Sequence, residues 1–194
     1  MKYKTISLII ILCYSSLCVS QNISEREYRI KKNEFPEIAY EFIRTELSNV
    51  RKLRFYKELD STKIIYKAKL KKDKLYYCLE FDAFGMLKNI EVLIARVDLP
   101  NDSFSEIQTY LGKNINKYKI QRISQQYVVT EESTVKITLI NAFQNLILPS
   151  INYELVVSGD SDKERREYEV LFDYEGSFKS LRKLAAPNYD HVLY

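Results

Sequence analysis

The sequence predicts an α+β protein of two tandem units, each a helix packed on a four-stranded antiparallel sheet. A short pattern recurs, because residues 79–85 (LEFDAFG) resemble residues 170–176 (VLFDYEG) at a constant offset of 91. A second pair, residues 35–38 (FPEI) and 104–107 (FSEI), recurs at an offset of 69. Each copy continues from a run with helical periodicity into alternating, strand-like segments, as expected of a repeated structural unit.

The two offsets differ by 22 residues, which places an insertion in the second copy. We therefore expect a first unit over residues 21–97 and a second over residues 98–194, with the insertion near 129–149. Within the insertion, apolar residues from Val135 to Leu146 fit one face of a helix that Ser133 or Thr134 would cap. Val135 to Ile140 is also rich in strand-forming residues, so helix and strand both remain open there.

The remaining elements follow in order along the chain. Apolar residues at helical spacing predict helices over 35–47 and 103–115, and Pro36 suits an opening turn. Alternating segments separated by short polar turns predict antiparallel strands. In the first unit these strands cover 50–59, 63–71, 74–82 and 86–95, and in the second 118–129, 151–158, 165–173 and 177–184.

The first twenty residues have the pattern of a secretory signal peptide. Met1 to Lys4 form a basic start, Ile6 to Leu17 an apolar run, and Cys18-Val19-Ser20 a small-x-small site. The apolar run is shorter than the roughly 20 residues that span a bilayer. We expect cleavage after Ser20 and export to the periplasm or the extracellular space, with no stable membrane insertion afterwards.

Charge and cysteine content narrow the function classes. The net charge is +4 with basic residues scattered along the chain, and loss of Lys2 and Lys4 with the signal lowers it to +2. This balance does not favour a nucleic-acid partner. After cleavage Cys78 is the one cysteine left, so no disulfide forms within the chain and an apolar core must stabilise it.

Strand alternation assigns side chains to the two faces of the predicted sheet. Tyr77, Leu79 and Phe81 share the face that the helices should cover, and so do Tyr168, Val170 and Phe172. The opposite, open face would carry charged and aromatic residues that could bind a protein or peptide. The candidate contacts are Lys67, Lys69, Tyr76 and Glu80. The alternative is a solvated face whose opposite charges pair across strands.

These features resemble bacterial PepSY-like proteins of the β-lactamase-inhibitor-like type. The matching pieces are Tyr77 to Ile94 and Tyr168 to Leu184, each with Phe-Asp-x-x-Gly between two strands. The resemblance implies an exported module that engages partner proteins through the open sheet face, and some relatives are linked to hydrolase inhibition. No inhibitory loop can be matched here residue by residue. The residues Asp82, Gly85, Asp173 and Gly176 are interpreted as structural turn residues, since Asp can accept backbone hydrogen bonds and Gly can adopt positive φ.

An enzyme is the less favoured class. The sole histidine, His191, has no signature that joins it to Cys78, and one Cys with one His falls short of a zinc site. Asp160, Asp162 and Glu164 alternate without EF-hand spacing. Phosphate-loop, dinucleotide and nucleophile-elbow motifs do not occur. We expect no cofactor, metal or catalytic residue, although paired carboxylates for glycoside chemistry need no sequence proximity.

The sequence thus predicts an exported, non-catalytic binding module for an unknown protein or peptide. The alternative is an envelope structural protein that acts by self-association.

Overall fold

The computed structural model describes residues 26–59, 63–161 and 164–184. The predicted signal peptide, its cleavage site after Ser20, and His191 lie outside the described residues. Within them, nine antiparallel strands form one sheet in the order β1-β2-β3-β4-β5-β6-β7-β8-β9. The strands are β1 Arg26–Ile30, β2 Arg51–Leu59, β3 Ile64–Lys72, β4 Leu75–Phe81, β5 Leu87–Leu93, β6 Asn116–Val128, β7 Asn152–Ser161, β8 Glu164–Asp173 and β9 Phe178–Lys183.

The prediction of two separate four-stranded units is wrong. Strand β5 pairs with β6 over Asn89↔Val128 to Leu93↔Ser124, and this ladder joins the two halves into one sheet. Strand β1, which the sequence analysis did not predict, extends the sheet beyond β2. The contact between β5 and β6 crosses a helix in sequence, so the local patterns that revealed the strands carried no information about it.

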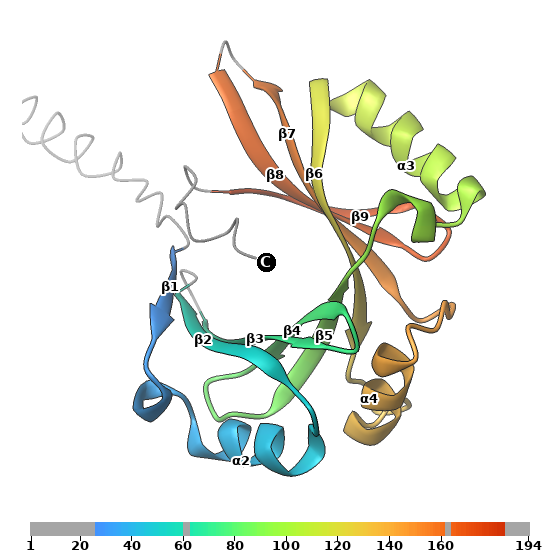
Figure 1. The fold of residues 1–194 in the computed structure, drawn as a ribbon. Helices are drawn as coiled ribbons and strands as arrows, with labels where there is room; N and C mark the ends of the chain where they lie inside the picture. Colours follow the sequence, from blue (N-terminus) through green and yellow to red (C-terminus); the bar gives the residue numbers. More distant parts are fainter. Residues whose placement is uncertain (1–25, 60–62, 162–163, 185–194) are drawn as a thin grey trace, which may run out of the picture.

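Three α-helices pack on one face of the sheet, on the outside of its bend (Figure 1). They are α2 Glu37–Glu46, α3 Asn101–Asn114 and α4 Val135–Phe143, and two short 3₁₀ turns, η1 Lys32–Glu34 and η2 Arg96–Asp98, precede α2 and α3. The inserted segment is therefore a helix, which settles the alternative left open by the sequence. Its Leu139 and Ala142 are buried, and Phe143 meets the ring of Tyr77 at 5.2 Å between centroids. Among the described residues, no helix has both the length and the apolar character needed to cross a membrane.

The apolar core lies between the helices and the sheet. Phe35 is central in the first half, with ring centroids 4.5 Å from Phe55 and 5.7 Å from Phe81. In the second half, Tyr110 of α3 stacks on Phe178 at 4.3 Å. The predicted inward residues of β4 and β8 belong to this core, and Tyr77, Leu79, Phe81, Val170 and Phe172 are all buried. Alternation therefore leaves the opposite face of every strand outside the core.

Two turns of equal geometry hold the helices against the sheet. Asp82 Oδ1 accepts the N–H groups of Phe84 and Met86, each at 3.0 Å, and Gly85 has φ +84°. Asp173 Oδ1 likewise accepts the N–H groups of Glu175 and Ser177.

Gly176, with φ +92°, lies directly on the start of α3. A Cβ added there would stand 2.2 Å from the carbonyl oxygen of Ser103. The Ser103 hydroxyl donates to the carbonyl of Tyr174 at 2.8 Å, which ties the helix to the same turn. Glycine is therefore required at this position by both conformation and space.

Candidate functional site: the concave sheet face

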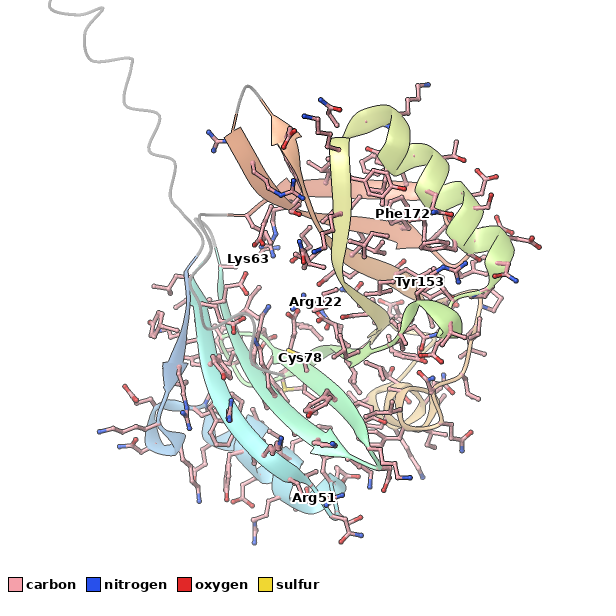
Figure 2. All side chains as sticks on the ribbon, turned by 45° about the horizontal axis from the view of Figure 1, so that its top comes forward. Arg51, Lys63, Cys78, Arg122, Tyr153 and Phe172 are labelled. Carbon is pink, nitrogen blue, oxygen red and sulfur yellow. The ribbon has the colours of Figure 1, made fainter. Side chains whose placement is uncertain are left out.

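The sheet bends strongly, and we call the inner side of the bend the concave face (Figure 1). In Figure 2, Cys78 and Arg122 lie toward the inside of the bend, whereas Tyr153 and Phe172 lie on the side of α3. Arg182 of β9 donates to Glu58 of β2 at 3.2 Å, although 124 residues separate them. The two ends of the sheet therefore come within hydrogen-bonding distance across the concave face.

Ten charged side chains of this face form what we call the charge network. They come from all nine strands, and most are buried or nearly so. They are Glu27 (β1), Glu58 (β2), Lys67 and Lys69 (β3), Glu80 (β4), Glu91 (β5), Arg122 (β6), Glu154 (β7), Glu169 (β8) and Arg182 (β9).

Lys67 is the centre of the first half of the network. Its ammonium lies 2.7 Å from Glu58, 2.7 Å from Glu80 and 3.8 Å from Glu27. Cross-strand register explains the contact with Glu80, which is the direct partner of Lys67 on β4. Burial lowers the pKa of Lys67, but the attraction of Glu80 and Glu58 outweighs it and raises the pKa well above the ordinary value. Lys67 therefore stays charged in the folded protein.

Lys69 forms a second ion pair on the same strand. Its ammonium contacts Glu27 of β1 and lies 4.5 Å from the centre of the Tyr56 ring. The side chains of Lys69 and Glu27 are 8% and 4% exposed. Removing both charges from water is costly, so the pair depends on the close approach of the two groups to offset that cost.

The second half of the network pairs arginines with glutamates. Arg122 Nη2 lies 2.9 Å from Glu154, and Arg182 Nη2 lies 2.8 Å from Glu169. Burial raises the pKa of Glu58, yet Lys67 and Arg182 together lower it to about 2. Arg182 thus links the two halves of the sheet through charges that stay ionised at neutral pH.

Glu91 differs from the other carboxylates of the network. Its cross-strand partners are Cys78 on β4 and Gln126 on β6, and its exposed fraction is 5%. Burial raises its pKa well above the ordinary value, and Glu154 and Glu80 raise it further. For Glu154 itself, burial and then Glu169 raise the pKa to about 7 despite Arg122.

The four predicted contact residues all lie on the concave face, but they differ in accessibility. Lys67, Lys69 and Glu80 are largely enclosed by their ion pairs, with side chains 12%, 8% and 13% exposed. Tyr76 is half-buried near the β3–β4 hairpin, and its ring lies 4.9 Å from the Lys71 ammonium and 5.8 Å from that of Lys52. Opposite charges do pair across strands, as the alternative interpretation supposed, but they do so in a buried setting.

Sequence reasoning missed five members of this site, which are Glu27, Glu58, Glu91, Arg122 and Arg182. Alternation in β2 could have placed Glu58 beside Tyr56 and away from Phe55. The contact between Arg182 and Glu58 depends on the bend of the sheet, which leaves no local signal.

The last features of this face to consider are the Cys78 thiol and possible metal-binding groups. Burial first, and then Glu91, raise the pKa of the Cys78 thiol well above its ordinary value, which disfavours the nucleophilic thiolate. Within the described residues, no group of three or more His, Cys, Asp or Glu side chains could hold a metal ion.

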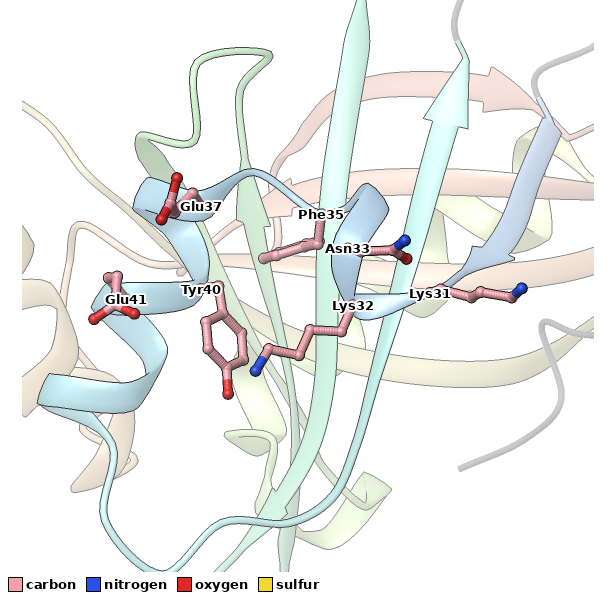
Figure 3. A pocket seen from close by; sticks show the side chains of 7 residues that line it. All are labelled: Lys31, Lys32, Asn33, Phe35, Glu37, Tyr40 and Glu41. Carbon is pink, nitrogen blue, oxygen red and sulfur yellow. The ribbon is translucent and has the colours of Figure 1, made fainter.

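A shallow pocket lies elsewhere, between η1 and α2 (Figure 3). Lys32 sits 3.9 Å above the Tyr40 ring, and the carboxylates of Glu37 and Glu41 line the same hollow. Glu41 is already paired with Arg44 at 2.6 Å and is 47% exposed. The carboxylate of Glu41 is therefore already engaged by an arginine at the edge of this pocket.

Together these features define a curved antiparallel sheet with helices outside and charges inside. No family model and no curated protein matches the chain. Among solved structures, a DUF2874 family protein from Bacteroides ovatus superposes with a TM-score of 0.50 at 9% identity, over 77% of this chain and 87% of that one.

Two further solved structures give similar values. A DUF2874 family protein from Bacteroides uniformis has a TM-score of 0.49 at 10% identity, over 76% of this chain and 88% of that one. A BLIP-like protein from Bacteroides fragilis has a TM-score of 0.48 at 12% identity, over 79% and 89%. The likeness to the Bacteroides ovatus protein shows a shared fold, whereas the PepSY resemblance and the internal repeat stay predictions.

Proposed function

We propose that this chain is an exported binding protein that engages a protein or peptide through the concave face. Export rests on the signal-like residues 1–20. The observation that carries the binding role is the charge network itself, which lines a sheet face that the three helices leave uncovered.

The energetics of the charge network support recognition rather than stability. Buried ion pairs lose several kcal/mol per ion on desolvation, and apolar residues of similar volume often stabilise a fold more. A face selected for stability alone would be expected to be apolar where it is buried. Fixed charges in a concave surface instead provide specificity toward a partner with complementary charge.

Tyr76 is the proposed anchor at the rim of this surface. Aromatic residues dominate binding energy at interfaces, because they bury much area with few rotatable bonds. Lys67, Lys69 and Glu80 are more enclosed, and their charges would orient the bound partner. The partner remains unidentified, and a hydrolase is one class that the experiment can reveal.

The test has two steps. The exported chain serves as bait for envelope and medium of the producing cell, and captured proteins are identified by mass spectrometry. The affinity of the captured protein is then compared for the wild type, Tyr76→Ala and Phe84→Ala. Phe84 is 80% exposed in the turn beside α2, outside the concave face, and is therefore the matched aromatic control.

We expect Tyr76→Ala to weaken binding at least tenfold, as for an aromatic hot-spot residue, while Phe84→Ala stays within about twofold. Equal affinity of Tyr76→Ala and wild type would contradict the proposal. If the bait captures only itself, concentration-dependent sedimentation would instead support the alternative of self-association.

A further inference from the structure

Strand β5 presents to the concave face two hydrogen-bond acceptors that have no donor among the described residues. They are the carboxylate of Glu91 and the side-chain oxygen of Asn89, two residues apart on the same side of the strand. This spacing corresponds to about 7 Å along a strand.

Glu91 is the unbalanced member of the charge network. Each other carboxylate of the network contacts a cation: Glu27, Glu58 and Glu80 contact lysine, and Glu154 and Glu169 contact arginine. Across the described ranges, Glu91 has neither an ion pair nor a side-chain hydrogen bond, although only 5% of its surface is exposed. The network thus holds six carboxylates and four cations.

Asn89 adds an independent observation. Its Nδ2 donates to Glu80 Oε2 at 2.8 Å, and because a carboxylate only accepts, this bond fixes the orientation of the amide. The Oδ1 atom is then directed away from Glu80 and has no hydrogen-bond partner, although it is buried. A buried acceptor without a donor loses its hydrogen bonds to water without compensation, and a suitable donor would recover that cost.

The neighbours of Glu91 indicate what could complete the site. Glu154 from β7 and Glu80 from β4 act on it with negative charge, and Lys67 and Arg122 compensate only in part. The directly opposed residues, Cys78 and Gln126, carry no opposing charge. The missing group is therefore positive and rich in donors.

We propose that Glu91 and Asn89 form the binding site for an arginine side chain of the protein or peptide partner. The proposal rests on the proposed function and specifies the chemistry of its ligand. A guanidinium carries five N–H donors in a planar fork, so it can engage a carboxylate with two bonds and still donate to a neighbouring carbonyl. An ammonium is a point charge with three donors and lacks this planar match.

The test uses the full exported chain and three short peptides. The probe is acetyl-Gly-Arg-Gly-amide. One control is the same peptide with citrulline, which keeps the shape of arginine and removes its charge, and the other is the same peptide with lysine, which keeps the charge without the planar group. Backbone NMR resonances are followed during titration of each peptide. We expect saturable shifts centred on residues 78, 89–91 and 126 with the arginine peptide and at least tenfold weaker binding of the citrulline peptide.

Two variants localise the effect. Glu91→Gln keeps the side-chain shape and should weaken binding of the arginine peptide at least tenfold. Glu106→Gln, on the exposed side of α3, should bind as the wild type does. The comparison of arginine with citrulline on the wild type needs no variant, so it holds even if Glu91→Gln fails to fold. Equal binding of the two peptides, equal binding of a lysine peptide, or shifts confined to other surfaces would overturn the assignment.

The captured partner separates this proposal from the proposed function. If Tyr76→Ala weakens binding of the captured partner and Glu91→Gln does not, the concave face binds the partner but Glu91 does not receive arginine. If neither substitution weakens binding of the partner, the proposal that it binds through the concave face is itself wrong.

Discussion

Replacing Glu91 by glutamine should stabilise the folded protein at neutral pH. Burial raises the pKa of this carboxyl well above its ordinary value, and Glu154 and Glu80 raise it further. Burial likewise raises the pKa of Glu154 to about 7, from an ordinary 4.5. Glutamine keeps the volume of Glu91 and removes a carboxyl whose ionisation is opposed by burial and by Glu154 and Glu80.

The magnitude follows from proton linkage. A carboxyl with a raised pKa binds more protons in the folded state than in the unfolded state, so stability falls as pH rises between the two pKa values. For Glu154 the interval runs from 4.5 to about 7. At about 1.4 kcal/mol per pKa unit, this corresponds to about 3 kcal/mol, complete above about pH 7.

Carboxyls with lowered pKa act in the opposite direction but in a different range. Burial raises the pKa of Glu58, whereas Lys67 and Arg182 lower it to about 2, so its stabilisation is complete above about pH 4.5 and is lost as pH falls toward 2. The free energy of unfolding should therefore be highest near pH 5 and should fall by about 3 kcal/mol on the way to pH 7.5.

The assay is urea unfolding followed by circular dichroism between about pH 5 and pH 8. Glu91→Gln should raise the free energy of unfolding at pH 7.5 by about 1–3 kcal/mol and flatten its decline with pH. The exposed Glu106→Gln should change neither quantity. A Glu91→Gln variant less stable than wild type at pH 7.5, with an unchanged pH slope, would refute the reasoning.

Three further outcomes are expected. Gly176→Ala should lower the free energy of unfolding by about 2–4 kcal/mol, because its Cβ would stand 2.2 Å from a backbone oxygen at φ +92°. Gly112→Ala on α3 should raise it by about 0.5–1 kcal/mol, because its Cβ would meet Tyr118 at an ordinary contact distance of 3.9 Å. Urea unfolding of both variants checks this, and equal effects would contradict it. Lys67→Met should destabilise the fold by about 3–5 kcal/mol, because Glu80 loses its ion-pair partner and Glu58 keeps Arg182 alone. The exposed Lys136→Met should cost less than about 0.5 kcal/mol in the same assay. The Cys78 thiol, buried and with a raised pKa, should react with iodoacetamide at least about 100-fold more slowly in the native protein than in urea, and similar rates by mass spectrometry would show that the thiol is accessible.

Local patterns predicted much of the fold. Period-two alternation correctly placed Tyr77 and Leu79 in the core and Tyr76 and Glu80 on the opposite face, because side-chain direction in a strand is set by the backbone itself. Helical spacing located α2 and α3 to within a few residues for the same reason.

Long-range pairing was not predictable in this way. The ladder between β5 and β6 and the extra strand β1 depend on contacts between segments far apart in sequence. The bend of the sheet determines that Arg182 meets Glu58, and it also encloses the charges of the predicted open face in a buried network. Glu91 could be assigned to that face from sequence, but its lack of a counter-ion depends on the positions of every other charge around it.

Hydroxyl-radical footprinting of the complex with the captured partner tests whether the partner binds through the concave face. We expect the partner to lower the modification rate of Tyr76, at the rim of the concave face, and to leave that of Phe84, beside α2, unchanged. Protection of Phe84 with an unchanged rate at Tyr76 would place the partner on the outer side of the sheet and would contradict binding through the concave face.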